Sequence, residues 1–187
     1  RKEGHGHVDM REALEQSCDV YFYEIAKRVG IDRITAMANK LGLGLETGIE
    51  LPSEKRGLTP TTSWKQATRG QKWVQGETLI AGIGQGFMLA TPLQLAVMSA
   101  RLANGGLAVS PTLVRRRPAE NGDSVEPESL GISKRHLDII RQGMVDVVHG
   151  DRGTARHTKI ADPDILVAGK TGTAQVRRIT MAERRAG

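Results

Sequence analysis

The chain has 187 residues, and its 27 Lys and Arg residues against 21 Asp and Glu residues give a net charge of +6. This length is enough for one domain with a hydrophobic core, and the single cysteine excludes an intrachain disulfide. No apolar run approaches the ~18 residues of a membrane span, and no nucleic-acid motif accompanies the basic residues, so we expect no nucleic-acid partner. The chain begins with arginine instead of methionine, and we therefore expect it to be a piece of a longer protein.

A helix is predicted over residues 10–29. Asp9 followed three residues later by Glu12 is typical of a capping box, and apolar residues then recur at helical spacing. Ser17 and Asp19 are two positions apart, so in an unbroken helix their side chains point about 200° apart. The periodicity favours an unbroken helix, in which the two side chains cannot share a cleft. The alternative is a break at Ser17 that lets both serve one site.

The next segments are expected to be a helix, a long loop and a short connection. The helix is predicted over Asp32–Leu41, with its first residue as the N-cap. Residues 53–78 are polar and predict a long functional loop or lid, anchored by Trp64 and Trp73. Gly-Ile-Gly-Gln-Gly at 82–86 lacks the spacing of a phosphate-binding loop, so its simplest interpretation is a tight connection before the next helix.

Two further helices are predicted in the second half of the chain. Thr91 is a cap with Pro92 at the first helical position, and Ser133–His149 is amphipathic. Residues 115–129 are charged and rich in Pro, Gly and Ser, which indicates a surface loop. The helix after Pro92 is expected to bury Leu93, Ala96, Val97, Ala100 and Ala103.

A strand is predicted over Ile165–Ala174. Its apolar, partly β-branched beginning suits a buried strand, and Gly172 leaves room for a ligand to lie flat against the backbone. Lys170 supplies a positive charge and the flanking threonines supply hydroxyls, a combination that suits an extended peptide bearing a carboxylate. The alternative is an edge strand with a solvated lysine. Strand alternation would put Lys170 and Thr173 on opposite faces, so a twist or bulge is expected.

Five motifs occur in an order that resembles the transpeptidase domain of class B penicillin-binding proteins. They are Ser-x-Asp at 17–19, Thr-Gly-Ile-Glu-Leu-Pro at 47–52, Gly-Ile-Gly-Gln-Gly at 82–86, Thr-Pro-Leu-Gln-Leu-Ala at 91–96 and Lys-Thr-Gly-Thr-Ala at 170–174. Together they span nearly the whole chain and are far more specific than any one of them. The Gly-His-Gly-His-Val-Asp opening is most similar to the elongation-specific members, the penicillin-binding protein 2 type.

The resemblance implies an α+β fold, that of penicillin-binding protein transpeptidases and serine β-lactamases, here incomplete and helix-rich. Residues 1–110 would be the mainly helical part of one partial domain, and 111–187 would hold a surface loop, a helix and the Lys-Thr-Gly strand. The family cross-links peptidoglycan without a catalytic cofactor. A serine attacks the D-Ala-D-Ala stem peptide and passes the acyl group to another strand's amine, and β-lactams acylate the same serine.

The resemblance also implies a cellular setting. Members of the elongation type work in the periplasm, anchored in the bacterial inner membrane by an N-terminal helix, beside a membrane glycosyltransferase of the elongation complex. The alternative functions are a non-catalytic penicillin-recognising sensor domain of the same fold and a basic binding module without enzyme ancestry. The motifs at 82–86 and 91–96 resemble synthase features and favour the transpeptidase.

Carried over from the family's motifs, the catalytic residues are Ser17, Asp19 and Lys170. Ser17 would relay a proton to the leaving amine, held by a hydrogen bond from Lys170. Thr173 would bind the substrate carboxylate and lend its backbone N–H to the oxyanion hole. Asp19 replaces the commoner Asn, as in the elongation subfamily, and the family pattern requires a helix break at Ser17. The substrate-binding residues would be Thr171, Gly172 and Thr173.

The family's nucleophile, the serine of Ser-x-x-Lys, is missing from this sequence. None of the eight serines has a lysine three residues later. Thr62 and Lys65 have the spacing but fall in the predicted polar loop. We therefore expect the nucleophile to lie upstream of Arg1, and this chain alone to be inactive.

Two further expectations concern zinc and self-association. His5 and Cys18 resemble ligands of a structural zinc in some elongation-type relatives, with two carboxylates lying upstream. The alternative is a buried cysteine beside exposed His5 and His7. If strands that flank Ile165–Ala174 are absent, its open edges are expected to cause association or a strand-swapped dimer.

Overall fold

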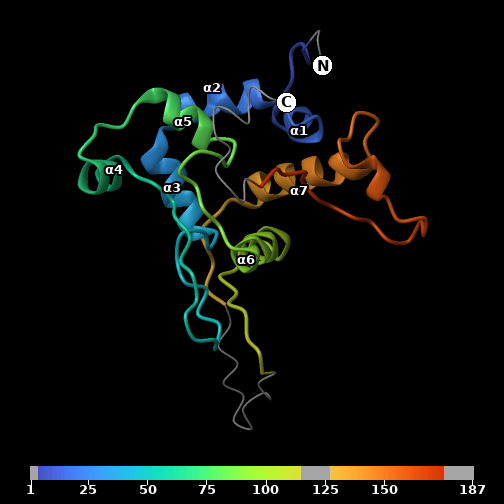
Figure 1. The fold of residues 1–187 in the computed structure, drawn as a ribbon. Coiled ribbons are helices and arrows are strands. Elements are labelled where there is room, and N and C mark those ends of the chain that lie inside the picture. The colour runs from blue at the N-terminus through green and yellow to red at the C-terminus, as the bar shows by residue number, and fades with distance from the viewer. Residues whose placement is uncertain (1–3, 115–126, 175–187) are drawn as a thin grey trace, which may run out of the picture.

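The computed structural model describes residues 4–114 and 127–174 of the chain (Figure 1). This part is helix-rich, as expected, and strand pairing within it is limited to two isolated antiparallel bridges, Leu58 with Leu89 and Leu107 with Ser129. No helix among these residues is long and apolar enough to cross a membrane. The elements are α1 (Met10–Glu15), α2 (Asp19–Val29), α3 (Ile31–Lys40), α4 (Thr62–Arg69), α5 (Gln75–Ala81), α6 (Pro92–Ala103), α7 (Lys134–His149) and the 3-10 turn η1 (Arg156–Thr158).

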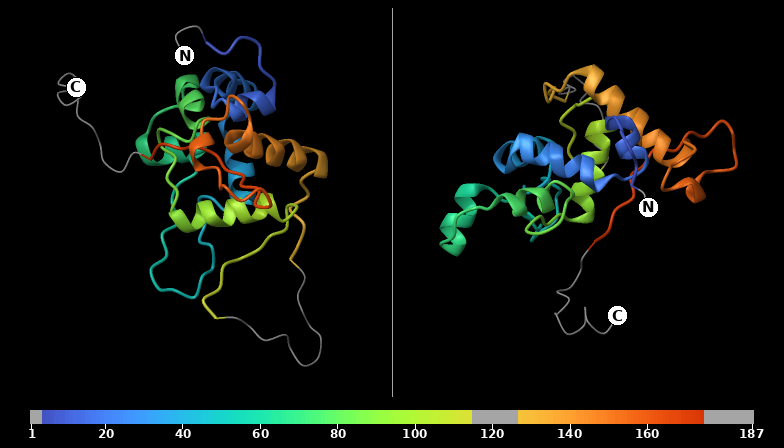
Figure 2. Two further views of the ribbon diagram at one scale, coloured as in Figure 1. Left: turned by 90° about the vertical axis from the view of Figure 1, so that its right-hand side faces the viewer. Right: turned by 90° about the horizontal axis from the view of Figure 1, so that it is seen from above.

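Two helix pairs organise the fold. α1 packs against α7, and α2 packs against α5, so helices far apart in the sequence lie side by side (Figures 1 and 2). Gly143 of α7 permits the first contact, because a Cβ there would lie 2.8 Å from Cδ1 of Leu14. The most deeply buried residues of these two helices include Ala13 of α1 and Leu137 and Val147 of α7, which are 0%, 1% and 0% exposed.

The first predicted helix is broken at Ser17, so the unbroken helix favoured by periodicity is wrong. The N–H of Ser17 donates to the Leu14 carbonyl at 3.3 Å, and that of Cys18 donates to the Ala13 carbonyl at 2.9 Å. This is the Schellman pattern that ends a helix, and Ser17 has the left-handed φ of 53° that the motif requires. Glycine usually occupies that position, so the sequence carried no local sign of the break.

The long loop predicted at 53–78 is also wrong, because it contains α4 and the start of α5. Thr61 begins α4 by accepting the Trp64 N–H at 2.9 Å. The sequence did not predict this helix because the residue that it buries is a lysine, Lys65, which is 4% exposed. A charged residue on the buried face removes the apolar periodicity that marks an amphipathic helix. Trp64 and Trp73 do act as anchors, since their ring centroids lie 5.3 and 6.2 Å from that of Phe87.

Asp32 is not the N-cap of α3 that the sequence predicted. α3 begins at Ile31 after Gly30, so Asp32 lies in the first turn of the helix. Its carboxylate accepts hydrogen bonds from the N–H and the hydroxyl of Thr62, both at 2.9 Å, and thereby ties α3 to the start of α4.

The predicted helices after Pro92 and Ser133 are confirmed as α6 and α7. Thr91 caps α6 in a capping box with Gln94. Of the expected buried face, Val97 is buried and Leu93 is half-buried, whereas the three alanines are exposed and Gln94 is buried in their place. Gln94 is fully buried and donates to the Leu45 and Arg56 carbonyls at 2.6 and 2.8 Å. Of the predicted surface loop, residues 115–126 lie outside the described part.

The strand predicted over Ile165–Ala174 is not formed in the described part of the chain. A strand needs a neighbouring ladder, and residues 4–114 and 127–174 supply none beside this segment. Ile165 and Leu166 are 46% and 68% exposed, while Val167 packs on the cluster around Val147. The Gly169 N–H donates to the Met144 carbonyl of α7 at 3.0 Å, which fixes the segment to that helix. Association through this segment stays a prediction.

Candidate active site

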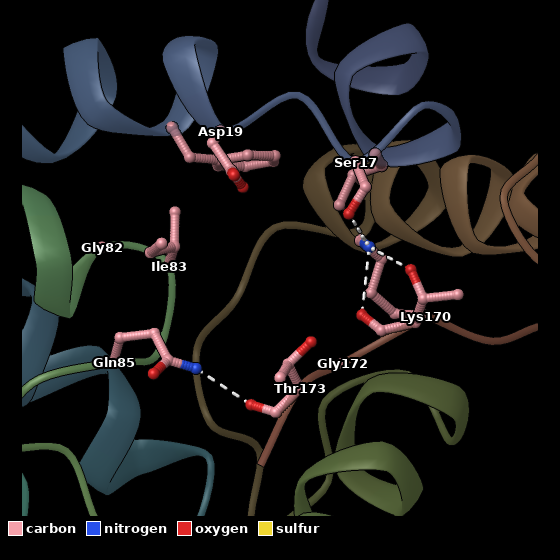
Figure 3. Close-up of a pocket in the computed structure, with 11 residues that line it drawn as sticks. Ser17, Asp19, Gly82, Ile83, Gln85, Lys170, Gly172 and Thr173 are labelled. Carbon is pink, nitrogen blue, oxygen red and sulfur yellow. Dashed lines mark hydrogen bonds between the residues drawn. The ribbon is translucent and has the colours of Figure 1, made fainter. Parts of the chain in front are cut away.

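A pocket of about 610 Å³ lies between the two helix pairs (Figure 3). All of the residues that the family motifs assigned to catalysis and substrate binding line it. The residues that sequence reasoning did not assign to the site are Leu14, Phe22, Gly82, Ile83 and Gln85.

Ser17 and Lys170 meet at one end of this pocket although 153 positions separate them in the sequence. The ammonium of Lys170 donates to Oγ of Ser17 at 2.6 Å and to Oγ1 of Thr171 at 3.0 Å (Figure 3). The left-handed turn at Ser17 aims its hydroxyl at Lys170. A non-glycine residue held in this conformation is strained by about 1–3 kcal/mol. Such strain is common where a side chain must be presented for function.

The surroundings of Lys170 make its ammonium group easier to deprotonate. Burial of the ammonium group lowers the pKa of Lys170, and the negative charge of Asp19 opposes this by raising it, with a net lowering. Asp19 is the first residue of α2, where the break turns its carboxylate toward the pocket (Figure 3). A lysine with a lowered pKa exchanges its proton more readily near neutral pH.

Lys170 and Thr173 both line the pocket, so the alternation expected of a strand does not apply here. Hydroxyl groups of Thr154 and Thr171 lie 3.2 Å apart and hold the middle of the segment. Gly172 is exposed, and a Cβ built there meets nothing within 4 Å. The segment therefore presents an open backbone edge to the pocket.

Gln85 enters the pocket from the turn that follows α5. Its Nε2 donates to the Thr173 carbonyl at 2.9 Å (Figure 3). The Gly84 N–H donates to the Ala81 carbonyl at 2.9 Å and the Gln85 N–H to the Ile80 carbonyl at 3.1 Å, a second Schellman pattern, with Gly84 at φ 76°. The glycine-rich motif is thus a tight connection, as predicted, and also part of the site. Recognising α5 as a helix ending at these glycines would have pointed to Gln85.

Thr62 and Lys65 do not form a nucleophile and base pair. The ammonium of Lys65 donates to Oε1 of Glu77 at 2.6 Å and to the Lys72 carbonyl at 3.0 Å. The Thr62 hydroxyl donates instead to Asp32.

The described residues alone do not form a zinc site. A structural zinc needs about four ligands, and no group of three or more His, Cys, Asp or Glu residues that could hold a metal occurs within residues 4–114 and 127–174. Cys18 is 6% exposed and begins α2 as its N-cap. The zinc expected from His5 and Cys18 therefore stays a prediction, and no step proposed below depends on it.

Comparison with known proteins identifies relatives along the whole chain. The family model for the penicillin binding protein transpeptidase domain matches residues 1–180. Peptidoglycan D,D-transpeptidase MrdA of Acinetobacter baumannii is 41% identical over 98% of the chain, and MrdA of Escherichia coli K12 is 38% identical over 94%. The chain spans 28% of the length of each of these curated relatives.

Solved structures agree with this assignment. The chain superposes on Pseudomonas aeruginosa PBP2 in complex with WCK 5153 with a TM-score of 0.80 and 44% identity, covering 91% of this chain and 39% of that one. It superposes on Helicobacter pylori PBP2, in complex with MreC, with a TM-score of 0.82 and 35% identity, covering 94% and 32%. The chain therefore belongs to the penicillin-binding protein transpeptidase family.

Proposed function

We propose that this chain is part of a peptidoglycan D,D-transpeptidase that cross-links stem peptides during cell elongation through a serine acyl-enzyme. The observation that carries the proposal is the 2.6 Å hydrogen bond between Lys170 and Ser17 within a pocket edged by the Thr171–Thr173 backbone. It joins a proton-transfer pair to a surface suited to an extended peptide.

In this proposal a serine outside the 187 residues attacks the carbonyl carbon of the penultimate D-Ala. The peptide C–N bond then breaks, and the terminal D-Ala leaves as an amine that takes a proton through Ser17. Lys170, with its lowered pKa, supplies that proton through Ser17 and is reprotonated by the hydroxyl proton that the attacking serine loses. An amine from a second stem peptide then attacks the ester and frees the serine. Thr173 binds the carboxylate of the departing D-Ala, and its N–H stabilises the oxyanion.

The setting proposed for the whole protein follows its relatives. H. pylori PBP2 occurs in a complex with MreC, and another structural neighbour, at a TM-score of 0.74, is a peptidoglycan synthase complex that coordinates polymerization and crosslinking. We extend this to a periplasmic enzyme that is anchored in the inner membrane, works beside a membrane glycosyltransferase and is acylated by β-lactams.

Mass spectrometry after incubation with a fluorescent penicillin tests this proposal. The full-length protein should gain one adduct, on a serine outside these 187 residues, and should cross-link stem peptides. The 187-residue chain should gain none, because none of its serines has an activating lysine three residues later.

Two outcomes would count against the proposal. A stoichiometric adduct on any of the eight serines of this chain would show that the nucleophile is misplaced. Labelling of the full-length protein without turnover of stem peptides would favour the sensor function.

The charge of Asp19 gives a pH-dependent prediction. Because Asp19 raises the pKa of Lys170, the substitution Asp19→Asn should lower that pKa further, so that Lys170 loses its proton at a lower pH. Because the proposed step uses the protonated form of Lys170, the falling, alkaline limb of the acylation rate against pH should then shift toward acid in the full-length protein. Glu24→Asn, an exposed substitution on α2, should leave the profile unchanged. An unshifted Asp19→Asn profile would contradict the coupling of the two residues.

A further inference from the structure

Gln85 occupies a position that the proposed reaction has not used. It bridges the turn after α5 to the Thr173 carbonyl across 88 positions of sequence, on the side of the pocket away from Ser17 (Figure 3). The Lys170 segment lacks a strand ladder in the described part of the chain, so individual hydrogen bonds must set its shape.

The segment is held at both ends and at Thr171, where the Thr154 hydroxyl lies 3.2 Å from that of Thr171. At one end Lys170 bonds to Ser17, and at the other Gln85 bonds to Thr173. Gly172 lies between these two points, is exposed, and has no side chain to restrict its rotation. Without the bond from Gln85 to the Thr173 carbonyl, the backbone after Gly172, including the Thr173 N–H, could rotate away from the pocket while Lys170 stayed in place.

The backbone of Gln85 is held in place by the turn that carries it. The Schellman hydrogen bond fixes its backbone N–H, and the positive φ of Gly84 sets the direction of the chain. Gly82 packs the turn closely against α2, where a Cβ would lie only 2.4 Å from the Cβ of Ala26. Because the backbone of this turn is already fixed, only the rotamer freedom of the Gln85 side chain is lost when it bonds, which suits a positioning role.

We propose that Gln85 is a positioning residue that, by holding the Thr173 carbonyl, fixes the backbone on both sides of Thr173, including the N–H used for oxyanion stabilisation and the side chain used for substrate binding. This inference rests on the proposed transpeptidase function. Gln85 acts through Thr173 and transfers no proton itself. Its loss should therefore slow acylation while leaving the Lys170–Ser17 pair and its pH dependence intact.

The test compares acylation of full-length wild-type protein, Gln85→Ala, Gln85→Glu and the control Gln66→Ala by a fluorescent penicillin. Gln66 is exposed on α4, so its substitution should change nothing. Gln85→Ala should lower the second-order rate constant about three- to tenfold, the equivalent of one hydrogen bond, with an unshifted pH profile.

The variant Gln85→Glu distinguishes loss of the hydrogen bond to Thr173 from a general effect of the substitution on folding. An ionised carboxylate cannot donate to the Thr173 carbonyl, whereas a protonated carboxyl group can. The rate of Gln85→Glu divided by that of wild type should therefore rise as the pH falls from 8 to 5. The inference would be overturned if Gln85→Ala were acylated as fast as wild type. It would also be overturned if the acylation rate of Gln85→Glu relative to wild type stayed constant with pH. Failure of the wild-type protein to become acylated would instead overturn the proposed function.

Discussion

Replacing Lys170 with alanine in the full-length protein is expected to lower the acylation rate about 10²–10⁴-fold, the range typical of a lost general acid–base group. The reason is local, because the ammonium of Lys170 holds Ser17 at 2.6 Å and no other amine donates to that hydroxyl within the described residues. Stopped-flow measurement of penicillin acylation gives the rate directly.

Lys27→Ala provides the matched control, since Lys27 is exposed on α2, away from the pocket. The Lys170→Ala protein should also keep its melting temperature, because the long side chain makes its hydrogen bonds at the edge of an open pocket. A loss below fivefold would exclude Lys170 from the proton-transfer step.

Replacing Glu77 with glutamine is expected to destabilise the protein by about 1.5–3 kcal/mol, the contribution of a hydrogen bond between charged groups in a partly buried pair. The side chains of Lys65 and Glu77 are 6% and 21% exposed and meet at 2.6 Å. Urea denaturation of the full-length protein measures the loss, with Glu24→Gln as a control at an exposed site of α2. The double variant Lys65→Met with Glu77→Leu should recover much of it, because neither charge remains.

The Glu77 effect should depend on pH. Burial raises the pKa of Glu77, but hydrogen bonds from Lys65 and the Val74 N–H outweigh it, so the pKa is lowered overall. A carboxylate with a lowered pKa in the folded state contributes stability above its unfolded pKa of about 4.3 and loses it as the pH falls through the folded value. The difference in free energy of unfolding between wild type and Glu77→Gln should therefore become smaller below about pH 4. A constant difference from pH 7 to pH 3 would contradict the ion pair.

Elements marked by local chemistry could be predicted from the sequence. Thr91 and Pro92 begin α6 through a side-chain cap and a fixed φ, both properties of adjacent residues. α4 could not be predicted, because the partner of its buried Lys65 lies twelve residues away on α5. The Lys170 segment has the composition of a strand, but a strand forms only where another chain segment completes its hydrogen bonds.

The site could be located from the order of motifs, whereas its geometry could not. Periodicity argued against a shared cleft for Ser17 and Asp19, and only the family pattern required the break that the structure contains. The break depends on a serine in a conformation that glycine normally occupies. The bond from Gln85 to Thr173 spans 88 positions, and nothing in either local sequence specifies the other residue.

The turn at Ser17 is also the joint between the two helix pairs. Lys170 is attached to the α1–α7 pair, because the N–H of the neighbouring Gly169 donates to the Met144 carbonyl of α7. Asp19 and Gln85 instead belong to α2 and to the turn after α5. On the other side of the pocket, the hydrogen bond from Gln85 to Thr173 connects the turn after α5 to the segment that Gly169 fixes to α7. The two helix pairs are therefore connected on both sides of the pocket, covalently through Ser17 and by a side-chain hydrogen bond through Gln85.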